Sequence, residues 1–388
     1  LPIDLGVNES PVFAIDQGDK VVIGVVIKRD GHDGIRVVRR ALDGTADPSF
    51  GSAGEAFLDV STLGLATPLA GAVAQADGKI VVAGAASNGS DVDPFIVRLT
   101  ADGQIDSALA LRKIDSTTAN LGFSAIDVGP GGELVIAGTK SLADTSDLYF
   151  LRLDSTGARD PGFGANGLAT FHDLKFTQVS SFVIQTDGRI VGLVQTLNSN
   201  GFDVPQFALR RFGTDGALDT TFGTAGKATL PTPEGLAFAN TLASPDRLNL
   251  FVGGSARGVL LGNSDTAVWK FASDGRLDLT FGGGIGYYVA APTATPADSV
   301  SRLVFAADGS IYGVGSESES FSLTNTLLLH LEANGAPATD FGDGLVRHPA
   351  AALTTRAAYL RADHRLILVM APIFPADAND TVLEAFFQ

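Results

Sequence analysis

The chain has 388 residues, a formal net charge of −16, no cysteine and 46 glycines. The lack of cysteine excludes disulfides, thiolate catalysis and cysteine-ligated zinc. The negative charge argues against nucleic acid as a partner and against electrostatic docking on an anionic membrane. No run of 18 apolar residues occurs, so the sequence predicts no membrane-spanning helix.

Four short strands recur along the chain in a fixed order. An apolar first strand, as in residues 69–76, leads into the turn Asp77-Gly78 and a β-branched second strand over 79–82. Asp-Gly between two apolar runs is a strong hairpin signal. An aromatic-rich third strand follows, as in residues 95–99, and a fourth strand follows a Phe-Gly dipeptide, as in 227–230. The third strand is apolar on both faces, which predicts that both faces are covered.

The Phe-Gly dipeptide sets the period of this pattern. It begins at Phe50, Phe163, Phe222, Phe281 and Phe341, of which the last four are 59, 59 and 60 residues apart, and Leu109 fills the missing place. The turn before the second strand recurs seven times. The sequence therefore predicts one all-β domain over residues 1–388, a seven-bladed β-propeller of four-stranded antiparallel blades. We number the repeats one to seven, at about residues 10–60, 68–116, 121–171, 178–230, 237–290, 299–348 and 354–388.

The last repeat ends after its third strand. Residues 1–7 resemble a fourth strand, so we expect the N-terminal segment to complete the last blade. Such closure would remove an open sheet edge.

The Asp-x-x-Phe-Gly motif, the Asp-Gly-(Lys/Arg)-Ile-Val turn and the period of about 59 residues resemble the bacterial delta-60 repeat family. The resemblance covers essentially the whole chain. It implies a propeller and proteins that are exported or lie on the cell surface, and it brings no set of catalytic residues.

A cation precedes the end of the third strand in six repeats. The residues are Arg39, Arg98, Arg152, Arg211, Lys270 and His330. We expect each cation to pair with an Asp of the nearby Asp-x-x-Phe-Gly turn through a charge-assisted hydrogen bond. A ring that binds anions is the alternative.

A second set, of aspartates, lies where the third strand begins. Its members are candidate metal ligands, for a cation such as calcium: Asp33, Asp93, Asp147, Asp203, Asp265 and Asp380. The simpler explanation is that each carboxylate accepts hydrogen bonds from its own turn. These turns join second to third strands, and by analogy with other propellers we expect the binding site on their face. The sequence implies no other cofactor.

Enzyme motifs are lacking. The chain has no Gly-x-Ser-x-Gly elbow, Walker loop, His-Glu-x-x-His or EF-hand loop. His330 and His348 are the candidate catalytic residues, although an ordinary substitution within the repeat explains both.

Three functions stay open at this point. The first is an exported bacterial scaffold that binds a protein or a glycan through one face, with a removed signal peptide explaining the start at Leu1. The second is a hydrolase, an esterase or glycan-active enzyme, with its site at the mouth of the axial channel. The third is a structural module of a larger surface protein.

Overall fold

The computed structural model describes residues 2–3, 11–64, 66–87, 89–114, 120–197, 204–232, 236–257, 264–290, 297–320, 323–339, 344–348, 353–361, 365–372 and 381–386. Within these residues the regular structure is 28 β-strands and three short 3-10 helices, η1 (Val60–Leu63), η2 (Ser107–Leu109) and η3 (Gly282–Gly284). The predicted all-β class is confirmed. None of the helices in this part of the chain has the length and apolar character that a membrane span requires.

Three sheets have four antiparallel strands. The first comprises β2 (Pro11–Asp16), β3 (Lys20–Arg29), β4 (His32–Ala41) and β5 (Glu55–Asp59). The second comprises β6 (Ala66–Ala74), β7 (Ile80–Ser87), β8 (Val92–Leu99) and β9 (Arg112–Lys113). The third comprises β26 (Leu353–Leu360), β27 (Leu366–Pro372), β28 (Thr381–Phe386) and the N-terminal β1 (Pro2–Ile3).

The remaining strands form two eight-stranded sheets. One holds β10 (Leu121–Val128), β11 (Leu134–Ser141), β12 (Ser146–Leu153), β13 (Leu168–Phe171), β14 (Phe176–Ile184), β15 (Ile190–Leu197), β16 (Gln206–Phe212) and β17 (Lys227–Thr229). The other holds β18 (Leu236–Ala243), β19 (Leu250–Arg257), β20 (Ser264–Phe271), β21 (Tyr287–Val289), β22 (Ala297–Phe305), β23 (Ile311–Ser320), β24 (Leu323–Leu331) and β25 (Leu345–His348). In each, one parallel residue pair joins two antiparallel groups of four, at Ser146↔Phe176 and at Ser264↔Ala297.

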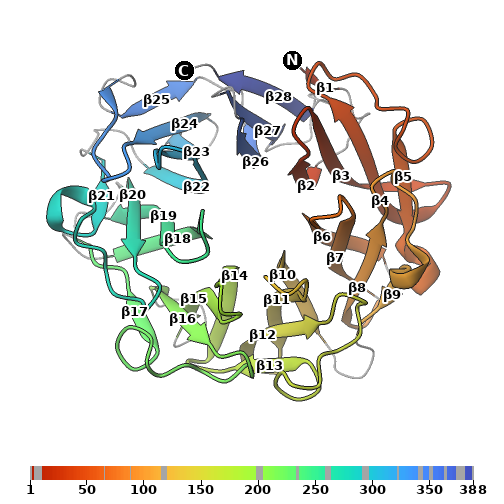
Figure 1. The fold of residues 1–388 in the computed structure, drawn as a ribbon, viewed down its shortest axis with the longest axis horizontal. Helices are drawn as coiled ribbons and strands as arrows, with labels where there is room; N and C mark the ends of the chain where they lie inside the picture. The colour runs from red at the N-terminus through yellow and green to blue at the C-terminus, as the bar shows by residue number, and fades with distance from the viewer. Residues whose placement is uncertain are drawn as a thin grey trace.

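The sheets surround a central axis (Figure 1), with the first strand of each repeat innermost. These inner strands are β2, β6, β10, β14, β18, β22 and β26. Each inner strand has a break in register where it pairs with the second strand of its repeat. A bulge bends a strand and increases its twist, so the same irregularity recurs around the axis.

The core lies between neighbouring sheets. Each apolar cluster joins the side chains of two successive repeats, as Phe13 and Val37 of repeat one join Val82 and Phe95 of repeat two. This packing follows from the both-faces-apolar pattern of the second and third strands, because each thin sheet buries its faces only against its neighbours.

The two ends of the chain lie together. β1 pairs with β28, with Pro2 opposite Val382 and Ile3 opposite Thr381. Repeat one also packs on repeat seven, through Val21, Ile23 and Val25 against Ile367 and Val369. The segment expected to act as a fourth strand is thus hydrogen-bonded to the last strand of the chain.

Candidate functional site

Five of the six cations pair with the Asp of the turn that follows them, as predicted, and no such pair is described for His330. In five repeats the cation contacts the Asp eight residues further on, at 2.7–2.9 Å. The pairs are Arg39–Asp47, Arg98–Asp106, Arg152–Asp160, Arg211–Asp219 and Lys270–Asp278. We call each such pair, with the aromatic or leucine side chain after it, a latch. Its cation is engaged within the fold, which disfavours a ring of anion sites.

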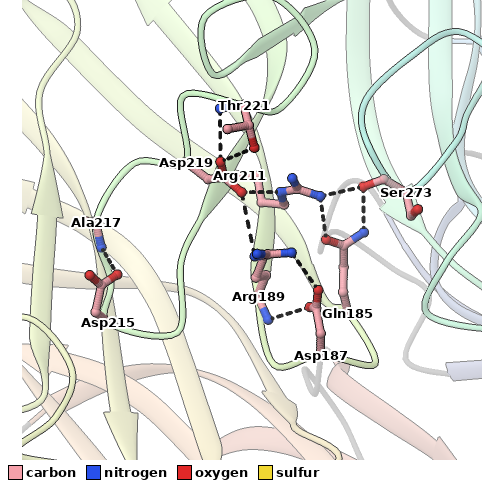
Figure 2. Close-up of polar contacts among 9 residues, drawn as sticks. All are labelled: Gln185, Asp187, Arg189, Arg211, Asp215, Ala217, Asp219, Thr221 and Ser273. Atoms are coloured by element: carbon pink, nitrogen blue, oxygen red, sulfur yellow. Dashed lines mark hydrogen bonds and ion pairs between the residues drawn. The ribbon is translucent and has the colours of Figure 1, made fainter.

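Three of the latches also reach the next repeat. The second arm of the guanidinium donates to a backbone carbonyl there: Arg39 to Ala101 at 2.6 Å, Arg98 to Ser155 at 2.8 Å and Arg211 to Ser273 at 2.8 Å. Figure 2 shows the latch of repeat four, with Arg211 between Asp219 and the Ser273 carbonyl. Gln185 adds its amide, since its Oε1 accepts from Arg211 and its Nε2 donates to Ser273.

The phenylalanine of the latch also lies where repeats four and five meet. The Arg211 guanidinium lies 4.9 Å from the ring centre of Phe222, which is fully buried. Gly275 of the next repeat covers this ring so closely that a Cβ there would lie 2.7 Å from it. The N–H of Gly223 donates to the Asp274 carbonyl of the same neighbouring turn. The motif is therefore a device that joins successive repeats.

The candidate metal ligands lie in separate repeats, and those whose side-chain contacts are resolved have partners of their own. Asp33 lies 3.6 Å from Lys28, Asp93 lies 2.8 Å from Lys113, and Asp147 lies 2.7 Å from His172. Asp265 is the second residue of β20, while Asp203 and Asp380 lie outside the described residues. Among the described residues no group of three or more His, Cys, Asp or Glu side chains could hold a metal ion.

The two candidate histidines belong to repeat six. His330 is buried on β24, where it takes the place of the latch arginine and stacks on Tyr312 with ring centres 4.2 Å apart. His348 ends β25, and its side chain lies outside the described residues. His348 pairs with Thr326, four residues from His330 along β24, or about 13 Å.

A hollow of about 590 Å³ opens between repeats two and three. It lies at the end of the sheets that carries the turns between first and second strands and between third and fourth strands. We call this end the turn face. The cations that line it are Lys79, Arg98 and Arg247, beside Gln75 and a single carboxylate, Asp77. The expected binding face is the opposite one, and many of its loop residues lie outside the described residues.

A glycine-rich turn forms part of the wall of the hollow. Repeat three has Gly129-Pro130-Gly131-Gly132 where repeat four has Gln185-Thr186-Asp187-Gly188. The Glu133 side chain lies against this turn, since a Cβ at Gly129 would lie 1.9 Å from its Oε1.

Arg247 reaches the hollow from repeat five. It stands where other repeats have glycine, with φ at +60°, a left-handed conformation that is costly for a residue with a Cβ. Its guanidinium donates to the carbonyls of Val128 and Ile184, each at 2.9 Å, and lies 3.3 Å from Asp127. One side chain thus ties repeats three, four and five together. Burial raises the pKa of Asp127, although the charge of Arg247 opposes the change.

Gln75 differs from its counterpart in repeat four. Gln185 accepts a hydrogen bond from the latch arginine, whereas the buried Oε1 of Gln75 accepts none from any described residue. An acceptor buried without a donor is unfavourable by about 1–3 kcal/mol. The fold therefore leaves this buried oxygen without a donor among the described residues.

Sequence reasoning did not find this hollow. Its signals are departures from the repeat, Gly129-Pro130-Gly131 and Arg247, and each by itself resembles neutral variation. Only the structure brings Arg247 beside a turn that lies more than 110 residues earlier in the chain.

Comparison with known families supports the repeat. The model of a β-propeller domain of unknown function, DUF5122, matches residues 75–108, 130–163, 185–222 and 249–281. The chain thus carries repeats of a β-propeller family, while the narrower delta-60 resemblance stays a prediction. No curated protein matches the chain.

Several solved structures share the fold. An ulvan lyase of the polysaccharide lyase family PL25 matches with a TM-score of 0.53 and 9% identity, over 99% of this chain and 93% of the lyase. A protein of unknown function from Dyadobacter fermentans matches with a TM-score of 0.50 and 11% identity, over 83% of this chain and 94% of that protein. Identities this low show a shared propeller architecture and nothing about activity.

Proposed function

We propose that this chain is an exported seven-bladed β-propeller, closed by its N-terminal strand, that binds a glycan through the turn face. It acts as a scaffold and not as a hydrolase. The hollow between repeats two and three is the single observation that carries this proposal.

Two observations support the seven-bladed, closed architecture. Splitting each eight-stranded sheet at its one parallel pair leaves groups of four strands, one for each sequence repeat. β1 adds to the group of repeat seven, and the apolar cluster between repeats seven and one continues the packing around the axis.

The shape and lining of the hollow support a glycan as the ligand. Its volume lies within the usual range for sites that take small ligands, about 300–1,000 Å³. Amide, ammonium and guanidinium groups on its wall suit hydroxyl-rich ligands, and Val128 and Pro130 offer apolar contact to the C–H face of a sugar ring. A flat protein partner is less well matched, because exposed apolar residues such as Ile105, Leu142 and Leu279 belong to different repeats.

The lining does not suit hydrolysis. Glycoside hydrolysis needs a pair of carboxyl groups across the scissile bond, and the described lining holds one carboxylate, Asp77, which is 3.0 Å from Lys79. A serine hydrolase needs a base within hydrogen-bonding reach of its nucleophile, and no histidine belongs to this lining.

A glycan array followed by titration calorimetry tests the function. We expect saturable binding of at least one oligosaccharide, and no release of product from a panel of esters, glycosides and polysaccharides. Turnover on that panel would contradict the scaffold, and so would an array without any bound glycan. Fractionation of cells that make the full-length product tests export. We expect to find the protein outside the cytoplasm.

A further inference from the structure

We infer that the hollow recognises an acidic sugar, whose acid group binds Arg247 and Lys79. This inference rests on the proposed glycan-binding function and adds the chemical class of the ligand.

Charge distribution supports an anionic ligand. The whole chain has 43 acidic and 27 basic residues, yet the hollow is lined by three cations and one carboxylate. Each of these cations also lies near a carboxylate, Asp77, Asp106 or Asp127, so an acid group is attracted only at short range by the remaining donors, while long-range charge works against non-specific binding.

Arg247 has donors left for a ligand. A guanidinium carries five N–H groups, and the hydrogen bonds to Asp127, Ile184 and Val128 use three of them. Its side chain is 33% exposed on the wall of the hollow. The remaining two donors can bind a carboxylate or a sulfate, which guanidinium groups recognise through paired hydrogen bonds.

The backbone conformation of Arg247 also supports a functional role. Glycine occupies this position in repeats two, three, four and six without strain, with φ between +80° and +90°. A residue held in a costly conformation is a reason to look for a functional role in addition to its bonds to three repeats.

Lys79 supplies a second cation. Its ammonium carries three donors, lies 3.0 Å from Asp77 and 3.8 Å from Asp106, and its side chain is 34% exposed. An ammonium partly neutralised in this way can still donate to one more oxygen. An acid group can therefore bind the remaining donors of both partly exposed cations.

Titration calorimetry with oligogalacturonate and with its methyl ester tests the inference, because the ester removes the charge and keeps the sugar. A sulfated oligosaccharide and inorganic sulfate are further ligands, which distinguish a carboxylated sugar, a sulfated sugar and a free anion. We expect at least one acidic oligosaccharide to bind about tenfold or more tightly than its uncharged counterpart, with weaker binding at high salt.

Two variants locate the site. Arg247→Gly restores the residue of the other repeats, and we expect the affinity for the acidic sugar to fall about tenfold or more, as does Lys79→Gln. Arg189→Gln is the matched control, because Arg189 holds the place of Lys79 in repeat four and contacts Asp187 and Asp219 in the same way. Melting curves of Arg247→Gly check that the fold is kept.

The outcomes separate the two proposals. Equal affinity for the acid and the ester, or acid binding that both hollow variants leave unchanged, would overturn the acidic-sugar inference while glycan binding stands. Binding of inorganic sulfate alone would overturn it as well. If no oligosaccharide binds, the proposed function itself fails.

Discussion

At the scale of single residues, the latch arginine combines several interactions that are usually spread over many side chains. Arg211 forms an ion pair with Asp219 at 2.9 Å, lies over Phe222 and donates to the Ser273 carbonyl of the next repeat. Because it is almost completely buried, these interactions are weakly screened by solvent and its removal leaves several acceptors unsatisfied.

We expect Arg211→Leu to lower the free energy of unfolding by about 1.5–3 kcal/mol, the range for hydrogen bonds to charged groups. Arg276→Leu is the control, because Arg276 pairs with Asp274 at 3.2 Å but is 84% exposed. An exposed ion pair contributes about 0–1 kcal/mol. Denaturant unfolding measures both, and equal losses would contradict the role of the latch.

The latch carboxylates predict acid sensitivity. Hydrogen bonds from the Ala108 N–H and from Arg98 lower the pKa of Asp106, and hydrogen bonds from Lys20 and Ser49 lower that of Asp47. As the pH falls below about 4, the unfolded state takes up protons before the native state does, so stability falls with decreasing pH. Calorimetric melting temperatures between pH 7 and pH 2 measure this, and Asp106→Asn is expected to flatten the acid slope. An unchanged slope in this variant would remove Asp106 from the explanation.

At the scale of elements, successive repeats meet where the turn after the third strand of one repeat lies on the latch phenylalanine ring of the preceding repeat. The turn glycine must lie on the aromatic ring of the preceding repeat, and the N–H that follows the ring bonds the same turn. Any side chain at that glycine competes with the ring for one space.

Gly275→Ala is expected to be more destabilising than Gly31→Ala by about 1–3 kcal/mol, the usual range for overpacking. Both residues have left-handed backbones, with φ of +83° and +86°, so strain contributes to both. A Cβ at Gly275 would meet Phe222 at 2.7 Å, whereas one at Gly31 meets nothing within 4 Å. Denaturant unfolding measures the free energy of unfolding of both variants. Equal losses of stability would show that backbone strain, and not the contact with Phe222, causes the effect.

The elements also show what the sequence can predict. The strands, the hairpin turns and the Arg–Asp pairs were predictable because each recurs at a fixed spacing, and repetition makes a local interpretation firm. The hollow was not, because it depends on departures from the pattern. Arg247 and Asp127 are 120 residues apart, and nothing local in either indicates that they meet.

At the scale of the whole molecule, the ends of the chain depend on each other. β1 contributes only two residues of backbone pairing to β28, but it occupies the place of a fourth strand at an edge that would otherwise be open.

Deletion of residues 1–7 is expected to lower the melting temperature sharply, because the last sheet would lose its edge strand and the proposed closure of the ring. Deletion of Leu1 alone is the control, since it leaves the paired residues Pro2 and Ile3 in place. Differential scanning calorimetry measures both. A melting curve unchanged by the longer deletion would contradict closure by this strand.

The latches differ from one repeat to the next around the molecule. Arg39, Arg98 and Arg211 each donate a further hydrogen bond to a backbone carbonyl of the following repeat. Lysine at 270 has a single ammonium held by Asp278, and histidine at 330 stacks on its own repeat. Opening should therefore start at the contact between repeats five and six, where an ammonium replaces the guanidinium of the other latches. Hydrogen–deuterium exchange would then label the amides of β24 before those of β4, and a molecule built from similar repeats would still have a preferred place to come apart.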